Sequence, residues 1–382
     1  MKNRLSALLC AVAACLVSMA QDRPAFVNLS VNTIELPVTA DSARWRSVAN
    51  QIVNARDNGE QVDIIHIGDS HIQAEMGTTK LREILQEKYG NGGRGLITAF
   101  KMAGTNQPVD YVIYGKEPSQ KQVRLLKRPW EITPGFTGIA SSVDVPNTVI
   151  YKNLKPGHSF NRAIIFTSEG SKRQQWTNLM DSAQFETIPN EKVYGVYTSN
   201  TNSPGIIYST IGNNGACYSD YLLIEGFADS VALLNPKLIV LSMGTNEGFS
   251  SMSEKEIESS TRQLICDLKK SNPNAVMMLW TPMECHKKGE DDVFHVVDKV
   301  KVAKDIMLDV ARQEGLAIWD FYEVAGGDGV AGQWVDAGLM NPRDHVHLLA
   351  KGYRLQGELA AEALISFFRS LSPASGVNSN SY

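Results

Sequence analysis

The sequence predicts an α/β protein: a three-layer α/β/α domain interrupted by an inserted antiparallel β-sandwich. Two observations support this fold class. From residue 237 onward, short apolar runs alternate with amphipathic helical patterns, which is typical of a parallel sheet covered on both faces. Between residues 98 and 204, short alternating runs are separated by Pro, Gly, Asn and Ser, and no helical period lies between them.

Elements of the α/β domain are expected on both sides of the insert. A helical pattern over 42–55 precedes a buried strand that ends at Gly68, and a second helical pattern runs over 74–89. Ser253, followed by Glu256, forms a capping box at the start of a later helix. After residue 237 we expect strands over 238–242, 275–281 and 317–321, and helices over 253–270, 296–313 and 352–370.

The insert is expected to be an independent module. A parallel sheet does not need about 100 extra residues between two neighbouring strands, so a folded unit is favoured over a long loop. Its expected strands lie over 110–114, 122–126, 148–152, 162–167 and 192–198. The predicted division is a signal peptide (1–20), a first part of the α/β domain (21–97), the insert (98–204), a second part (205–371) and a disordered tail (372–382).

The start of the chain has the pattern of a secretory signal peptide. Lys2 and Arg4 precede an apolar run over 5–17, which is too short to span a bilayer, and Ser-Met-Ala at 18–20 forms a cleavage site. We therefore expect export to the periplasm or the exterior. Lipid attachment at Cys15 is the less favoured alternative, because apolar residues follow this cysteine directly.

Composition excludes several classes of function. The net charge is −4 and no basic run occurs, which argues against nucleic acid and anionic membranes as partners. No later segment has the length of a transmembrane helix. Beyond the signal peptide, Cys217, Cys266 and Cys285 are too few for a disulfide framework, although one bridge stays open. Cys266 falls on the apolar face of a predicted helix and is expected in the core.

Three residues have the chemistry of a nucleophilic triad. Ser70 lies in the run 64–71, an apolar strand that ends on Gly-Asp-Ser, and Asp344 and His347 lie three residues apart near the other end of the chain. A serine hydroxyl is a weak nucleophile at neutral pH. It needs an imidazole to accept its proton and a carboxylate to orient that imidazole. Together the three residues could attack an ester.

Two further segments supply candidate donors to an oxyanion. Gly215 lies in the run 208–216, and Asn246 ends the buried-strand pattern 237–246. A backbone N–H at a glycine, which no side chain hinders, and a neutral amide can each stabilise a developing oxyanion by roughly 3–4 kcal/mol. Taken singly, each of these motifs is also ordinary turn or helix-cap chemistry.

In this order, the four motifs resemble the SGNH (GDSL-like) hydrolase superfamily. The resemblance implies a flavodoxin-like α/β/α domain with Ser70 as nucleophile, His347 as base and Asp344 orienting that base. It also implies an oxyanion hole formed by the N–H groups of Ser70 and Gly215 and the side-chain amide of Asn246. Glu247 is a departure, since many members have Asp after this Asn.

Further motifs narrow the resemblance. Gly-Asp-Ser-His at 68–71, the glycine-rich loop at 89–95 and Asn-Gly-Ala at 214–216 are similar to those of the peptidoglycan O-acetylesterase group, whose insert resembles a carbohydrate-binding module. The resemblance implies a serine esterase that removes O-acetyl groups from peptidoglycan or another O-acetylated polysaccharide through an acetyl-serine intermediate. The candidate sugar platforms in the insert, each more typical of a sandwich core, are Trp130, Phe136, Tyr151 and Trp176.

Several alternatives stay open at this point. The substrate could be a dietary or host glycan, the acetyl group could pass to a sugar rather than to water, or the protein could bind glycans without activity. No cofactor or metal is expected. His345 and His347 form a His-x-His pair, but no other Cys/His pair has zinc spacing, and the loop 90–95 lacks the Lys-Ser/Thr of a P-loop. No Gly-x-Ser-x-Gly elbow surrounds Ser70.

Overall fold

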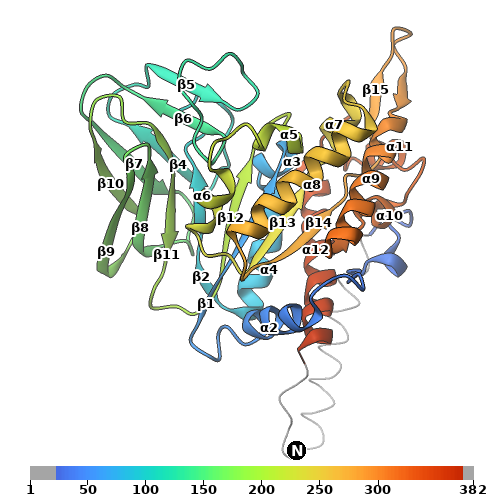
Figure 1. Cartoon of the computed structure of the whole chain (residues 1–382), viewed down its shortest axis with the longest axis horizontal. Coiled ribbons are helices and arrows are strands. Elements are labelled where there is room, and N and C mark those ends of the chain that lie inside the picture. Colours follow the sequence, from blue (N-terminus) through green and yellow to red (C-terminus); the bar gives the residue numbers. More distant parts are fainter. Residues whose placement is uncertain (1–22, 373–382) are drawn as a thin grey trace, which may run out of the picture.

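A computed structural model describes residues 23–372 of the chain. The predicted signal peptide and Cys15 lie outside the described residues, as does nearly all of the predicted disordered tail. The described part contains a parallel α/β domain with an antiparallel β-sandwich packed beside it (Figure 1). This arrangement confirms the predicted fold class.

The parallel sheet has six strands in the order β17-β14-β13-β1-β12-β2, and each neighbouring pair is parallel. Without the short edge strand β2, the chain order is 2-1-3-4-5, the flavodoxin-like order. The strands are β1 (Gln61–Gly68), β2 (Asn91–Gly93), β12 (Gly205–Gly212), β13 (Leu238–Ser242), β14 (Val276–Trp280) and β17 (Ala317–Trp319).

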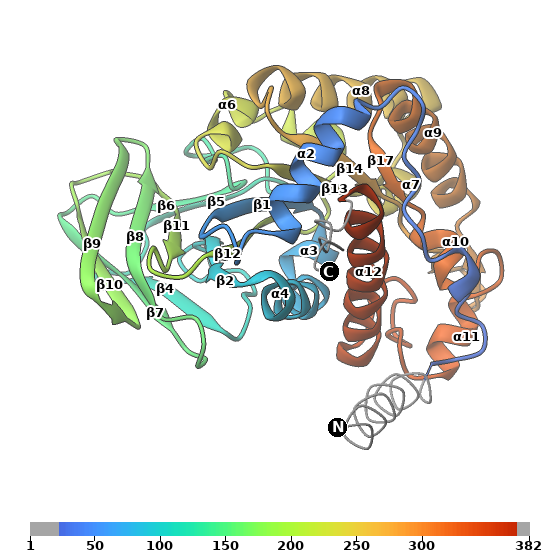
Figure 2. The same cartoon turned by 90° about the horizontal axis from the view of Figure 1, so that it is seen from below.

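Helices cover both faces of this sheet (Figure 2). Strand side chains alternate between two cores, so Ile64 packs in one and Ile65 in the other. The first core is closed by α2 (Ser42–Val53), α4 (Met76–Tyr89), α10 (Phe321–Ala325), α11 (Ala331–Asp336) and α12 (Ala350–Leu371). The second is closed by α5 (Tyr218–Tyr221), α6 (Phe227–Ala232), α8 (Glu254–Ser271) and α9 (Asp298–Glu314).

Short elements complete this domain. They are η1 (Leu29–Val31), α3 (Ser70–Gln73), α7 (Thr245–Phe249) and the hairpin of β15 (His286–Lys288) and β16 (Phe294–Val296). The predicted capping box at Ser253 and Glu256 is present at the start of α8. No described helix combines the length and the apolar character needed to cross a bilayer.

The insert forms two antiparallel sheets around its own core. One sheet consists of β4 (Tyr111–Gly115), β7 (Asn147–Asn153) and β10 (Ser182–Thr187). The other consists of β5 (Lys121–Arg124), β6 (Ile139–Ser142), β8 (Phe160–Thr167), β9 (Gly170–Met180) and β11 (Val193–Ser199), and β3 (Gly95–Thr98) pairs with β11. Antiparallel pairing therefore starts at β3, before residue 98; the domain boundaries stay predictions.

One buried-residue prediction is wrong. Cys266 is exposed, because α8 buries the stripe that contains Ile265 and the next residue points about 100° away around the helix. Cys217 and Cys285 are buried, and all three cysteines are free, so the open alternative of one bridge does not occur among the described residues.

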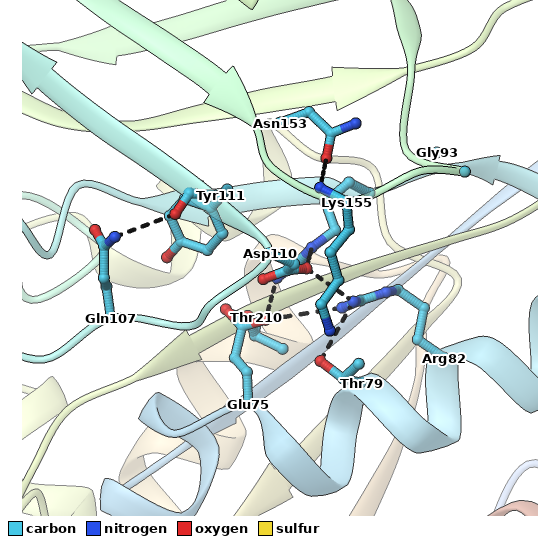
Figure 3. Close-up of polar contacts among 12 residues, drawn as sticks. Glu75, Thr79, Arg82, Gly93, Gln107, Asp110, Tyr111, Asn153, Lys155 and Thr210 are labelled. Carbon is cyan, nitrogen blue, oxygen red and sulfur yellow. Dashed lines mark hydrogen bonds and ion pairs between the residues drawn. The ribbon is translucent and has the colours of Figure 1, made fainter. Parts of the chain in front are cut away.

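A buried ion cluster joins the insert to the α/β domain (Figure 3). Asp110 of the insert accepts hydrogen bonds from Arg82 at 3.2 Å and Arg94 at 2.9 Å. Glu75 pairs with Arg94 and accepts from the Thr210 hydroxyl at 2.8 Å. The four charged side chains are at most 3% exposed. Since two guanidinium groups face two carboxylates, the cluster fixes the insert against the start of α4, and removing one member would leave a buried charge unpaired.

Candidate active site

The candidate site lies where three neighbouring parallel strands end. Gly68 of β1 is in register with Gly212 of β12 and with Ser242 of β13. Because the carboxyl ends of parallel strands meet at one edge of the sheet, the loops after these strands bring Ser70, Gly215 and Asn246 together. These three residues line one pocket with His347.

The predicted triad is assembled in the structure. Ser70 Oγ lies 2.9 Å from His347 Nε2, and His347 Nδ1 lies 3.0 Å from Asp344 Oδ2. These distances suit proton transfer from the hydroxyl to the imidazole and orientation of the imidazole by the carboxylate. The side chains of His347 and Asp344 are 43% and 37% exposed, so the pocket is open to a substrate from outside.

Asp344 is held by a set of donors that sequence reasoning did not include. Its Oδ1 accepts from the backbone N–H groups of Val346 and His347, at 2.9 and 3.0 Å, and its Oδ2 accepts from the Asn341 side chain at 2.9 Å. Partial burial opposes the charge on Asp344, but these N–H donors and the His347 ring together hold its pKa below the ordinary value. The carboxylate is therefore ionised and fixed beside His347.

Gly215 lines the pocket, and its backbone conformation explains why a glycine is there. Its φ is +83°, a conformation that L side chains rarely adopt, whereas an added Cβ would meet only Leu126, at 3.6 Å. Backbone conformation rather than crowding thus favours glycine here. Within residues 23–372, the Gly215 N–H donates to no other protein group.

Asn246 lies beside the nucleophile loop with its amide already engaged. Its Nδ2 donates to Asp69 Oδ2 at 3.3 Å and to the Ala216 carbonyl at 3.1 Å. An oxyanion must therefore share or replace one of these bonds, and the longer one, to Asp69, is the weaker of the two.

Two buried carboxyl groups flank this amide. Burial raises the pKa of Asp69 to about 7, although the His71 N–H opposes the shift. Burial also raises the pKa of Glu247 to about 7, against a hydrogen bond of 2.8 Å from the Tyr218 N–H. Glu247, the departure from the family pattern, is thus a buried group that supports the helix α5 backbone rather than a residue of the pocket surface.

Gln73, Asn106 and Asn214 connect the insert to the oxyanion loop, and sequence reasoning missed all three. Gln73 Nε2 donates to Thr105 Oγ1 at 3.2 Å and to Asn106 Oδ1 at 3.1 Å, while Gln73 Oε1 accepts from the Asn214 N–H at 2.8 Å. Asn214 Nδ2 also donates to Asn106 Oδ1 at 2.9 Å. A loop of the insert therefore forms part of the pocket wall. In the sequence, the signal that could have pointed to this network was the position of Asn214 directly before Gly215.

The two residues of the His-x-His pair face different surroundings. His345 has φ +51°, stacks on Phe294 with ring centroids 3.6 Å apart, and lies 3.3 Å from His286 through the Nδ1 atoms. His347 faces Ser70 instead. In the part of the chain that the structure describes, no group of three or more His, Cys, Asp and Glu side chains is placed to hold a metal ion.

The pocket around Ser70 has a volume of about 620 Å³, which is within the range of small-molecule sites and larger than an acetyl group requires. Phe249, Met76 and Val346 give it apolar walls. A substrate can therefore place much more than an acyl group against the protein.

Residues 193–355 match the GDSL-like Lipase/Acylhydrolase family. This span contains Gly215, Asn246, Asp344 and His347, and Ser70 lies ahead of it, on the other side of the insert. The chain carries a GDSL-like acylhydrolase domain. It is accordingly a carboxylic ester hydrolase.

Solved structures show where the fold of this acylhydrolase recurs. A structure of a peptidoglycan O-acetylesterase matches with a TM-score of 0.72 and 19% identity, covering 88% of this chain and 99% of that one. The match extends over the insert as well as the α/β domain, and at this identity it shows the fold. No curated protein matches the chain.

Two smaller structures overlap with less than half of the acylhydrolase. The acetyl xylan esterase AlAXEase matches with a TM-score of 0.35 and 19% identity, covering 41% of this chain and 81% of that one. A lipase/acylhydrolase from Enterococcus faecalis matches with a TM-score of 0.34 and 15% identity, covering 42% and 77%.

Proposed function

We propose that this acylhydrolase is an exported serine esterase that removes O-acetyl groups from carbohydrate, peptidoglycan being the favoured substrate. The main observation behind this proposal is that Ser70, His347 and Asp344 are joined by hydrogen bonds of 2.9 and 3.0 Å. They lie in a pocket lined also by Gly215 and Asn246. The fold shared with a peptidoglycan O-acetylesterase, insert included, supports this choice of substrate. The signal-peptide pattern at 1–20 supports export.

In the proposed reaction Ser70 Oγ attacks the acetyl carbonyl while His347 Nε2 accepts its proton. The N–H groups of Ser70 and Gly215 and the amide of Asn246 stabilise the oxyanion. His347 then protonates the departing sugar hydroxyl and an acetyl-serine remains. Water, deprotonated by His347, attacks this ester, acetate leaves, and the Ser70 hydroxyl is restored.

The test is acetate release from a panel of O-acetylated polymers that includes peptidoglycan and xylan. We expect the wild-type protein to release acetate, with the highest kcat/KM on peptidoglycan. Ser70→Ala should lower kcat roughly 10³-fold or more, because triad members act as a unit. A xylan or host glycan cleaved faster than peptidoglycan would change the proposed substrate. Full activity of a correctly folded Ser70→Ala protein would remove Ser70 from the mechanism.

The proposal has one alternative of a different class, a glycan-binding protein without activity. It would need a broken triad, whereas the described hydrogen bonds join all three members. Acetyl transfer to a sugar uses the same residues. Mass analysis of the sugar products distinguishes transfer from hydrolysis, since transfer adds an acetyl group to an acceptor sugar.

A further inference from the structure

A second cavity lies beside the catalytic pocket, between helix α4, helix α12 and the insert. Its volume is about 350 Å³. Ala74, Met76 and Asn106 line both this cavity and the pocket around Ser70. Because the two hollows share a wall, a ligand whose reacting group sits at Ser70 can extend into the second cavity.

The acidic residues at the bottom of this cavity are already compensated. Glu75 and Asp110 line it, and both belong to the buried cluster with Arg82 and Arg94. Two carboxylates face two guanidinium groups there, so the floor carries no net charge from this cluster. The charge that a ligand meets in this cavity is therefore set by the side chains at its rim.

Basic side chains from both domains stand on that rim. Lys155 comes from the insert and Arg354 from α12; both are exposed, and among residues 23–372 neither has a carboxylate within 4.0 Å. Lys80 is 3.5 Å from Glu358, and Glu83 is the exposed carboxylate of the rim. Figure 3 shows the Lys155 side chain extending from the insert past Asp110 toward Thr79 of α4.

We propose that this cavity is a subsite for a carboxylate of the glycan whose acetyl group lies at Ser70. Lys155 from the insert and Arg354 from α12 would bind the carboxylate, and Arg354 can do so with two parallel N–H donors. The inference rests on the proposed function and names its substrate class, an acidic O-acetylated glycan.

Two kinds of sugar supply such a carboxylate: a muramic acid, through its lactyl ether, and a uronic acid. The two sources of the carboxylate can be distinguished by comparing how the protein binds pairs of oligosaccharides that differ in the acidic group. The first pair is the disaccharide of N-acetylglucosamine and N-acetylmuramic acid with its neutral counterpart chitobiose. The second is a glucuronic-acid-branched xylo-oligosaccharide with the unbranched one. Binding of each sugar to the protein is measured by calorimetry. None of these four sugars carries an acetyl ester, so the measurement does not depend on turnover.

We expect the acidic member of one pair to bind at least tenfold more tightly than its neutral counterpart. The pair that shows the difference identifies the source of the carboxylate. The double change Lys155→Gln and Arg354→Gln should remove that preference, and added salt should weaken it in the wild type. Lys255→Gln, an exposed lysine of α8, is the control for a change in net charge. Equal binding of acidic and neutral sugars in both pairs, or a preference that survives the double change, would overturn the subsite.

Turnover distinguishes failure of the subsite from failure of the proposed function. With an O-acetylated form of the preferred acidic oligosaccharide, the double variant should lose at least tenfold in kcat/KM, mostly through KM, and less than twofold on a small aryl acetate. Wild-type protein that cleaves the aryl acetate but no O-acetylated glycan would contradict the proposed function, whichever sugars the protein binds in the calorimetric measurement. Wild-type protein that cleaves acidic and neutral glycans equally would contradict the subsite alone.

Discussion

At the residue scale, the candidate site divides into groups with a sequence signal and groups without one. Ser70, Gly215 and Asn246 each lie shortly after an apolar strand, and parallel strands end at one edge, so the sequence brings them together. Their individual roles, and those of Asp344 and His347, are implied by the resemblance to SGNH hydrolases and stay predictions. Gln73 and Asn106 could not be predicted. The partners of Gln73, Asn106 and Asn214, are 33 and 141 residues away along the chain, and a lone amide has no periodicity.

Gln73 is a positioning residue for the oxyanion loop, and this role can be tested. Gln73→Ala removes the link between the insert loop at Asn106 and the Asn214 backbone, so the Gly215 N–H loses a support. We expect kcat to fall about tenfold with little change in KM, because an oxyanion donor acts mainly in the transition state. The measurement is steady-state kinetics on a small aryl acetate, at a temperature where the protein is fully folded.

Gln86→Ala is the matched control for this change. Gln86 is also a buried glutamine, and its Nε2 bridges the Gly93 and Ile206 carbonyls, away from Ser70. Both variants should lose about 1–3 kcal/mol of unfolding free energy through an unsatisfied buried group, but only Gln73→Ala should lose kcat. Equal losses of kcat in the two variants would assign Gln73 to stability alone.

At the element scale, most but not all insert strands could be predicted. Five were placed within two residues of β4, β5, β7, β8 and β11. Three were missed: the exposed strand β9 (Gly170–Met180), whose sequence is mostly polar, and the short strands β6 and β10. The helix after Ser70 was predicted as one segment from residue 74. It is instead two helices separated at Glu75, whose φ of +52° interrupts the turn so that its carboxylate enters the ion cluster.

Helix α3 carries the nucleophile, and its position depends on a glycine in the neighbouring strand. A Cβ at Gly212 would lie 2.2 Å from the Gln73 backbone nitrogen and 2.6 Å from the Ile72 carbonyl carbon. Since backbone atoms cannot rotate aside, Gly212→Ala should displace α3, lower the unfolding free energy by about 1–3 kcal/mol and reduce kcat. Thermal unfolding and kinetics of the same preparation measure both effects.

Gly332→Ala in α11 is the comparison for that substitution. Nothing lies within 4 Å of a Cβ there, so alanine should be neutral or stabilising by up to about 1 kcal/mol, as in an unobstructed helix. A Gly212→Ala protein as stable and active as the Gly332→Ala protein would mean that α3 does not depend on the close approach.

At the scale of the whole molecule, the insert is part of the catalytic domain's packing rather than an appendage. Asp110 compensates the buried Arg82 and Arg94, and Asn106 lines the pocket. Replacing the insert by a flexible linker would leave two guanidinium groups without this partner, so substitutions at Lys155 and Arg354 are the sharper experiment. The sequence pattern predicts the insert as a module, but these contacts join residues far apart in the sequence and carry no local signal.

Three buried carboxyl groups give the whole fold an unusual dependence on pH. Burial raises the pKa values of Asp63, Asp69 and Glu247 to about 7, from ordinary values of 3.8, 3.8 and 4.5. Between about pH 4 and pH 7 the folded protein therefore binds more protons at these groups than the unfolded chain does. Their contribution to stability is fully present below about pH 4 and is lost as the pH rises through about 7.

Glu247→Gln isolates one of these groups, since glutamine can still accept the Tyr218 N–H but cannot ionise. We expect denaturant unfolding to show that the wild type loses more stability than this variant between pH 5 and pH 8, by about 1 kcal/mol or more. Glu254→Gln, an exposed glutamate at the start of α8, should follow the wild type at both pH values. If Glu247→Gln also paralleled the wild type, Glu247 would be ionised in the folded protein at both pH values, and its charge would need a partner inside the core. The structure supplies backbone N–H donors there rather than a cation, so the neutral acid at low pH is the form that the core accommodates.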